Sequence, residues 1–161
     1  MRSLAAAMVA GLCALPAAAQ DAASIIDLIC GRTVHYFNPA LGNQIEYTAP
    51  NGDAFLWHSQ TDKLVIGIWE VNEISLDYGE VCYKYLPGSF SDLDPGSEFC
   101  FDYDALIADV PTDGVREGAP YNLASGQMPF PLPFDTPVSV EDLREAFPDQ
   151  PPERACGVLM M

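Results

Sequence analysis

The fold is decided by one stretch, Lys63 to Tyr103, which reads KLVIGIWEVNEISLDYGEVCYKYLPGSFSDLDPGSEFCFDY. Lys63 to Asn72 is apolar on both faces, as a central strand is, and from Glu73 onward apolar residues recur at every second position, the period of a β-strand. Turns are predicted at Gly79-Glu80 and in a longer loop, Pro87 to Ser97, which has a Pro-Gly pair near each end. We therefore predict four antiparallel strands: Lys63–Asn72, Glu73–Tyr78, Val81–Tyr85 and Glu98–Tyr103.

Two cysteines, Cys82 and Cys100, fall on the less apolar side of the last two strands. The opposite side is aromatic and aliphatic, with Val81, Tyr83, Tyr85, Phe99, Phe101 and Tyr103. Directly opposed residues of an antiparallel pair have Cβ atoms about 4.5–5.5 Å apart, which is close to the disulfide range. We predict a Cys82–Cys100 disulfide and, by elimination among the four cysteines after residue 20, a second one between Cys30 and Cys156.

The first twenty residues have the three parts of a secretory signal peptide. Arg2 supplies the positive charge, Leu4 to Leu15 the apolar segment, and Ala17 to Ala19 the small residues of a cleavage site. The apolar segment is too short for a transmembrane helix, which needs about 20 residues. We predict a signal peptide at residues 1–19 and one exported domain, periplasmic or secreted, at residues 20–161.

The exported chain would be strongly acidic. Without Arg2 it has six Lys or Arg against 23 Asp or Glu, a formal net charge of −17. Such a charge repels the phosphates of nucleic acids and anionic lipid surfaces, and it favours solubility. The composition therefore argues against nucleic acid as a partner and against membrane insertion after signal removal. A basic protein partner or a small ligand stays open, and the oligomeric state is not indicated.

The remaining elements are short. Asp21 to Cys30 has an apolar side and is followed by Gly31, a residue typical of the position after a helix C-terminus. A strand at Gly31–Phe37 comes next, and Ile45 to His58 then carries two strands around Asn51-Gly52, a strong hairpin signal. The first of the two, Ile45–Ala49, alternates apolar and polar residues strictly, which predicts a half-buried strand.

A proline-rich tail, about residues 111–161, follows a strand-rich core at about residues 31–103 and holds nine of the 14 prolines. Its segment MPFPLPF permits no central strand, so we predict an extended tail that wraps the core with Phe130, Leu132 and Phe134 in surface grooves. Ser139 starts a short helix that ends near Phe147. The fold class is thus mainly β (α+β), a bent antiparallel sheet or partial barrel of six or seven strands with short helices near both ends.

The order of short motifs in the core resembles a group of small exported bacterial proteins of unknown function. The motifs are Gly31-Arg32-Thr33-Val34-His35-Tyr36, Ile45-Glu46-Tyr47, Gly52 with Leu56-Trp57, Gly67-Ile68-Trp69 and Val81-Cys82-Tyr83-Lys84-Tyr85. The resemblance covers about residues 30–103 and implies an exported location and a fold of repeated short strands. It implies no activity, and the tail lies outside it.

Few residues point to chemistry. The two histidines, His35 and His58, fall on predicted strands, and neither a nucleophile elbow nor an H-E-x-x-H motif is present. Asp92, Asp94 and Glu98 offer oxygen ligands for Ca²⁺ as weak candidates, because their order departs from that of an EF-hand. No cofactor and no catalytic residue is predicted.

The many aromatic residues predict a packed core, with an aromatic groove for a small apolar or sugar ligand as the alternative. Trp57 is the candidate for an exposed contact residue. We therefore expect a non-enzymatic binding or interaction module, for example one that masks a basic partner such as a cell-wall hydrolase. The alternative is a carboxylate-based or metal-assisted hydrolase.

Overall fold

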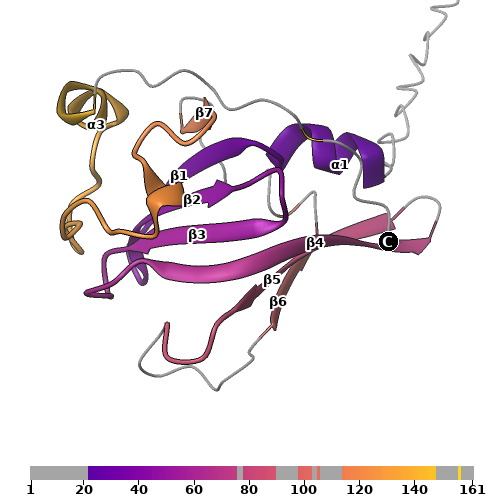
Figure 1. Cartoon of the computed structure of the whole chain (residues 1–161). Coiled ribbons are helices and arrows are strands. Elements are labelled where there is room, and N and C mark those ends of the chain that lie inside the picture. The colour runs from indigo at the N-terminus through magenta and orange to yellow at the C-terminus, as the bar shows by residue number, and fades with distance from the viewer. Residues whose placement is uncertain are drawn as a thin grey trace, which may run out of the picture.

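The computed structural model describes residues 22–75, 78–89, 98–102, 105, 114–147 and 156. Its centre is one antiparallel sheet of seven strands in the order β6-β5-β4-β3-β2-β1-β7, curled into a half-barrel (Figure 1). The strands are β1 (Arg32–Asn38), β2 (Gly42–Thr48), β3 (Asp53–His58), β4 (Val65–Ser75), β5 (Tyr78–Tyr85), β6 (Glu98–Asp102) and β7 (Val115–Glu117). The mainly β fold class is confirmed, whereas residues 1–19, with the predicted signal peptide, lie outside the described residues.

The hairpin of β2 and β3 forms as the sequence predicts. Asn51 and Gly52 make its turn, in which Gly52 has a φ of 91°, a conformation that glycine adopts without strain. The Ala49 N–H donates to Asp53 O at 2.8 Å, and the Asp53 N–H donates to the Asn51 side chain at 3.1 Å. Unlike the predicted half-buried strand, however, β2 is buried along its whole length.

Two predictions about the strands are wrong. Lys63–Asn72 and Glu73–Tyr78 are not separate strands, because β4 runs without interruption through eleven residues and absorbs an irregularity in register between Glu73 and Ser75. Gly79-Glu80 is not a turn, since both residues lie inside β5 and pair with β4.

The tail adds a strand that the sequence did not predict. β7 pairs with β1 at the sheet edge, with Thr33 opposite Arg116. The tail then crosses one face of the sheet through the 3-10 turn η1 (Leu123–Ser125) and reaches α3 (Val140–Ala146). As predicted, Ser139 caps α3, and its Oγ accepts from Asp142 N at 3.0 Å.

The face under the tail is an apolar core. It contains Ile45, Tyr47, Phe55, Trp57, Leu64, Tyr121, Leu123, Leu132 and Leu143. Asn43 fastens the tail to β2, because its Nδ2 donates to Pro133 O at 2.6 Å and Thr136 O at 2.7 Å while its Oδ1 accepts from Val138 N at 2.9 Å. The tail is therefore an integral layer of the fold.

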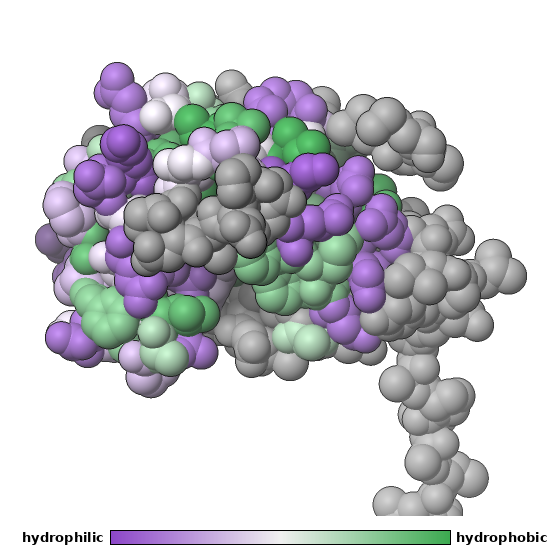
Figure 2. Space-filling view, turned by 90° about the horizontal axis from the view of Figure 1, so that it is seen from below, coloured by the Kyte–Doolittle hydropathy of each residue, from purple (hydrophilic) through white to green (hydrophobic). Residues whose placement is uncertain are grey.

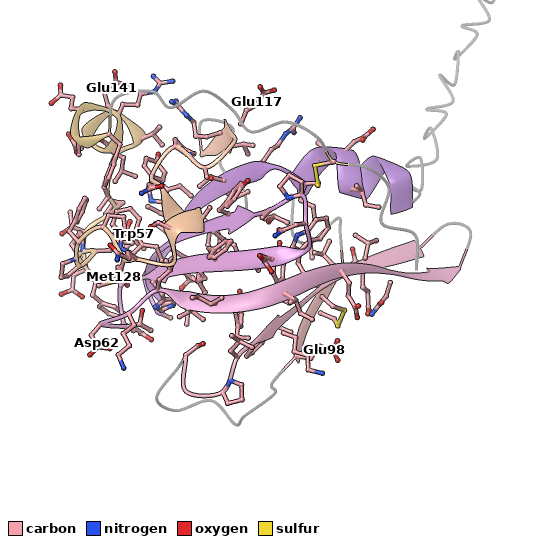
Figure 3. All side chains as sticks on the ribbon, viewed as in Figure 1. Trp57, Asp62, Glu98, Glu117, Met128 and Glu141 are labelled. Carbon is pink, nitrogen blue, oxygen red and sulfur yellow. A yellow bond between two sulfur atoms is a disulfide. The ribbon has the colours of Figure 1, made fainter. Side chains whose placement is uncertain are left out.

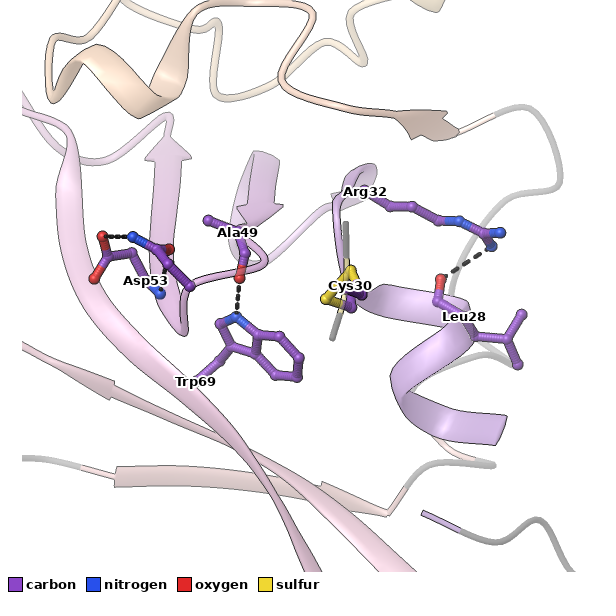
Figure 4. Close-up of a disulfide and its surroundings, with 8 residues drawn as sticks. Leu28, Cys30, Arg32, Ala49, Asp53 and Trp69 are labelled. Carbon is purple, nitrogen blue, oxygen red and sulfur yellow. Dashed lines mark hydrogen bonds between the residues drawn. A yellow bond between two sulfur atoms is a disulfide. The ribbon is translucent and has the colours of Figure 1, made fainter. Parts of the chain in front are cut away.

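The other face is concave and is covered at one end by α1 (Ala22–Ile29). Here Ile29 and Cys30 pack against Ala54, Trp69, Val81 and Tyr83. Trp69 Nε1 donates to Ala49 O at 2.7 Å, close to the disulfide of Cys30 (Figure 4). Among the described residues, no helix is both long and apolar enough to cross a membrane.

Both predicted disulfides are confirmed. Cys82 and Cys100 are directly opposed on β5 and β6, with a Cα–Cα distance of 4.1 Å. Cys30 bonds to Cys156 with a Cα–Cα distance of 6.0 Å. This second bridge joins residues 126 positions apart, so it ties the tail to the end of α1.

Candidate functional site

Among the described residues, Glu46 on β2 is the one buried carboxylate of the concave face. Ile45 and Tyr47 on either side of it point into the apolar core under the tail, so the alternation of a strand directs Glu46 to the opposite face. Its partners in register there are Val34 on β1 and Leu56 on β3. The side chain of Glu46 is only 6% exposed.

A hydrogen bond across the curl of the sheet holds Glu46. Tyr85 OH, on β5, donates to Glu46 Oε1 at 2.7 Å, although β3 and β4 lie between the two strands. Gly67 on β4 makes this approach possible. A Cβ atom at Gly67 would lie 2.8 Å from the Tyr85 ring and 2.6 Å from Lys84 O, far inside van der Waals contact. The absence of a side chain at residue 67 therefore lets the tyrosine ring lie over β4.

Burial dominates the electrostatics of Glu46. It raises the pKa of the carboxyl from its ordinary 4.5 to about 7, and the hydrogen bond from Tyr85 lowers it only in part. None of the described cationic side chains acts on this pKa. Burial and the nearby carboxylate raise the pKa values of Tyr36, Tyr83 and Tyr85, so these phenols stay neutral.

Two more polar side chains share this face without a hydrogen bond to described residues. Gln44 precedes Glu46 by two positions on β2, and it is directly opposite Tyr36 on β1. Gln44 is 7% exposed and its Nε2 is buried without a partner. A buried amide that lacks a hydrogen bond costs about 1–3 kcal/mol, and such groups are rare in folded proteins. Together with the hydroxyl of the half-buried Tyr36, this row offers polar groups that a ligand is able to satisfy.

Aromatic rings extend the face toward the edge strand β6. Tyr83 and Tyr85 stack at a centroid distance of 6.3 Å, Phe101 meets the edge of Tyr83 at 6.4 Å, and Phe99 lies 6.1 Å from Tyr85. Phe101 is 43% exposed. In the view from below, hydrophobic surface alternates with hydrophilic side chains (Figure 2). The site thus combines one carboxyl, one amide and a tyrosine hydroxyl with a row of rings.

Sequence reasoning missed Glu46 and proposed Trp57 instead, and the expectation of an exposed Trp57 is wrong. Its side chain is fully buried under the tail, where Nε1 donates to Phe130 O at 2.7 Å (Figure 3). The ring also meets Phe130 edge-on at a centroid distance of 4.8 Å. The tail thus occupies the aromatic surface that the sequence offered to a ligand, so the ligand hypothesis based on Trp57 fails.

The other predicted site residues do not come together. Asp92 and Asp94 lie outside the described residues, and Glu98 is exposed on β6, so the calcium prediction stays untested. Glu80, Cys82 and Cys100 lie within 4.8 Å of one another, but both sulfurs are consumed by the disulfide. That group therefore has only one carboxylate to offer a metal ion.

The two histidines lie on opposite faces of the sheet. His35, opposite Ile45, faces the core under the tail, where its Nε2 is 3.3 Å from Asn43 Oδ1. His58, opposite Gln44, faces the concave side, and its Nδ1 accepts from Gln60 N at 3.0 Å. Burial lowers the pKa of His58, so this imidazole is neutral near pH 7.

A separate cavity of about 360 Å³ lies between β7 and α3. Val115, Arg116, Ser139, Val140, Glu141 and Arg144 line it. Glu141 forms a 3.6 Å ion pair with Arg144 between two exposed side chains, so part of the positive charge is already neutralised. This cavity is a weaker candidate than the concave face, because it has no polar group left buried without a partner among its lining residues.

The fold and the concave site define a small half-barrel protein that is stabilised by two disulfides. Among its described residues, one carboxyl group inside the curl is buried and has no cationic partner. Comparisons with protein-family models, with curated proteins and with solved structures found no match to this chain.

Proposed function

We propose that this chain is an exported, non-enzymatic binding protein that holds its ligand on the concave face around Glu46. One observation carries the proposal. Glu46, Gln44 and Tyr36 place polar groups without a full set of hydrogen bonds among aromatic rings on one face of the half-barrel. Ligand sites are typically apolar and aromatic surfaces with a few well-placed polar groups, and this face has that composition.

A face with a purely structural role would have no evident need for these polar groups. A purely structural core filled by Leu or Phe would be more stable, because buried polar groups without partners are destabilising. Tyr36 and Tyr85 are half-buried, and Phe101, farther along the row of rings, is 43% exposed, so the row extends from Glu46 to the surface of the protein.

The proposal is tested by nuclear magnetic resonance with ¹⁵N-labelled protein and a panel of organic ammonium ions, monosaccharides, short fatty acids and basic peptides. We expect at least one class to shift the side-chain amide of Gln44 and the backbone amides of β1 and β2. Glu46→Ala should abolish those shifts, whereas Glu70→Ala, an exposed site on β4, should not. Shifts confined to other surfaces, or none with any class, would contradict the proposal.

Export is part of the same proposal. It rests on the signal-like segment at residues 1–19, on the resemblance to small exported bacterial proteins, and on the two disulfides, which are stable in oxidising compartments. Expression of the full chain in a bacterium, followed by N-terminal sequencing of the periplasmic fraction, should give Gln20 as the first residue. Recovery of the chain only from the cytoplasm, with Met1 intact, would count against export.

The hydrolase alternative has one supporting observation. A carboxyl with a pKa of about 7 is suited to general acid or base catalysis near neutral pH. Glycoside hydrolysis, however, uses two carboxylates, and no other described carboxylate acts on the pKa of Glu46. Turnover of chromogenic glycosides that Glu46→Gln abolishes would favour this alternative over binding.

A further inference from the structure

We propose that the group bound beside Glu46 is an organic cation, either a protonated amine or a quaternary ammonium, held by the carboxylate and by the faces of the surrounding rings. The inference rests on the proposed function and names the chemistry of its ligand. It follows from three independent features: an uncompensated carboxylate and nearby aromatic rings among the described residues, and the charge of the whole chain.

The first feature is the carboxylate of Glu46, which has no cationic partner among the described residues. Glu46 accepts one hydrogen bond, from Tyr85 OH to Oε1, and no described residue donates to Oε2. The cation on the same face of β1, Arg32, is directed away, because its Nη1 donates to Leu28 O at 3.1 Å (Figure 4). Buried carboxylates are normally paired with a cation, so a ligand cation would supply the partner that the chain itself lacks.

The rings are the second feature. Aromatic faces attract cations through their quadrupole, and groups of aromatic rings recognise quaternary ammonium ions in this way. Tyr85 reaches Glu46 through its hydroxyl, and the carboxylate also raises the pKa of Tyr36 and Tyr83, so all three aromatic side chains lie near Glu46. Phe99 and Phe101 continue the row to the sheet edge. An anionic ligand would be repelled by these faces.

The third feature is the long-range field. A chain with 23 acidic and six basic residues after residue 19 draws cations toward it and repels anions. The buried Nε2 of Gln44 is a donor, so it needs an acceptor on the ligand, such as the hydroxyl oxygen of choline, while the amide oxygen accepts from an ammonium N–H. Glu46 is also the group on this face whose protonation changes near pH 7. His58 is neutral there, and Tyr36, Tyr83 and Tyr85 remain protonated phenols.

The test compares choline and n-butylammonium with 3,3-dimethylbutan-1-ol, the neutral isostere of choline, by following the side-chain amide of Gln44 in ¹⁵N-labelled protein at low salt. We expect both cations to bind at least tenfold more tightly than the neutral alcohol. Binding should tighten at least fivefold from pH 5.5 to pH 8, because Glu46 must lose its proton. Glu46→Gln should weaken it at least tenfold, while the exposed control Glu70→Gln should change it less than twofold.

Each result decides the inference. Equal binding of choline and its neutral isostere, or an unchanged affinity in Glu46→Gln, would overturn it. If neither cation binds but another class of the wider panel shifts the same residues, the cation inference fails and the proposed binding function stands. If no class shifts them, both fail. A folded state of Glu46→Gln is checked by its thermal transition, which we expect to be at least as high as that of the wild type at pH 8.

Discussion

Replacement of Glu46 by Gln should stabilise the protein at high pH and leave it nearly unchanged at low pH. The folded state raises the pKa of Glu46 from 4.5 to about 7, and each pKa unit corresponds to ~1.36 kcal/mol. Ionisation of the buried carboxyl therefore costs the folded state about 3 kcal/mol. Because the pKa of Glu46 is higher in the folded state, the wild type has its full stability below about pH 4.5. It loses this contribution of about 3 kcal/mol as the pH rises through 7.

Gln has nearly the same shape as Glu and still offers an oxygen to Tyr85, but it does not ionise. We expect its free energy of unfolding to exceed that of the wild type by about 3 kcal/mol at pH 8.5, and to match it within about 1 kcal/mol at pH 4. The assay is urea unfolding with both disulfides intact, followed by tryptophan fluorescence at several pH values. Glu70→Gln removes the same charge from an exposed position and serves as the control.

A stability difference between Glu46→Gln and the wild type that stays constant from pH 4 to pH 8.5 would refute the reasoning. It would mean that water or a cation already compensates the carboxylate in the folded protein. A difference of opposite sign, with the variant less stable at pH 8.5, would show that the ionised form is stabilised by a partner that burial alone does not suggest.

Three further variants test the supports of the site. Gly67→Ala should destabilise the fold by about 1–3 kcal/mol in urea, because its Cβ would lie 2.8 Å from the Tyr85 ring, and unchanged stability would contradict the close approach. Asn43→Ala removes three hydrogen bonds to the tail, so it should lower the free energy of unfolding by about 2–4 kcal/mol and raise the rate of proteolysis in the tail. Equal cleavage rates in the variant and the wild type would argue against this anchoring role. The double variant Cys82→Ser and Cys100→Ser opens a loop between residues 18 positions apart and should lower the free energy of unfolding by about 3 kcal/mol. An unchanged free energy of unfolding would show that the bridge adds no net stability.

The local parts of the fold were predictable from the sequence. The Cys82–Cys100 bridge followed from strand alternation, which fixes the side of each residue, and from adjacency of the two strands. The turn at Asn51-Gly52 followed from the backbone freedom of glycine. Such features depend on few neighbouring residues, so a single sequence contains nearly all the information they need.

The curvature of the sheet was not predictable, and the site around Glu46 was missed because that curvature forms it. Alternation in Ile45 to Thr48 places Glu46 opposite the apolar side, which predicts a solvated carboxylate. The curl instead brings Tyr85 over β3 and β4 and buries that second face. The sequence signal for this curl is Gly67, but a glycine in a strand is also found at bulges and at other close backbone contacts. Trp57 was misplaced for the related reason that the tail covers the face on which it lies.

The energetics of Glu46 bear on what kind of protein this is. A side chain that costs about 3 kcal/mol when ionised takes up a large share of a typical domain stability of 5–15 kcal/mol. Glutamine would keep the shape and the hydrogen bond without this cost, so packing alone gives no reason for a carboxyl here. Two disulfides that each contribute a few kcal/mol let the fold tolerate it. Destabilising groups of this kind are expected where function requires them, and the charge of Glu46 is therefore the feature that a ligand would use.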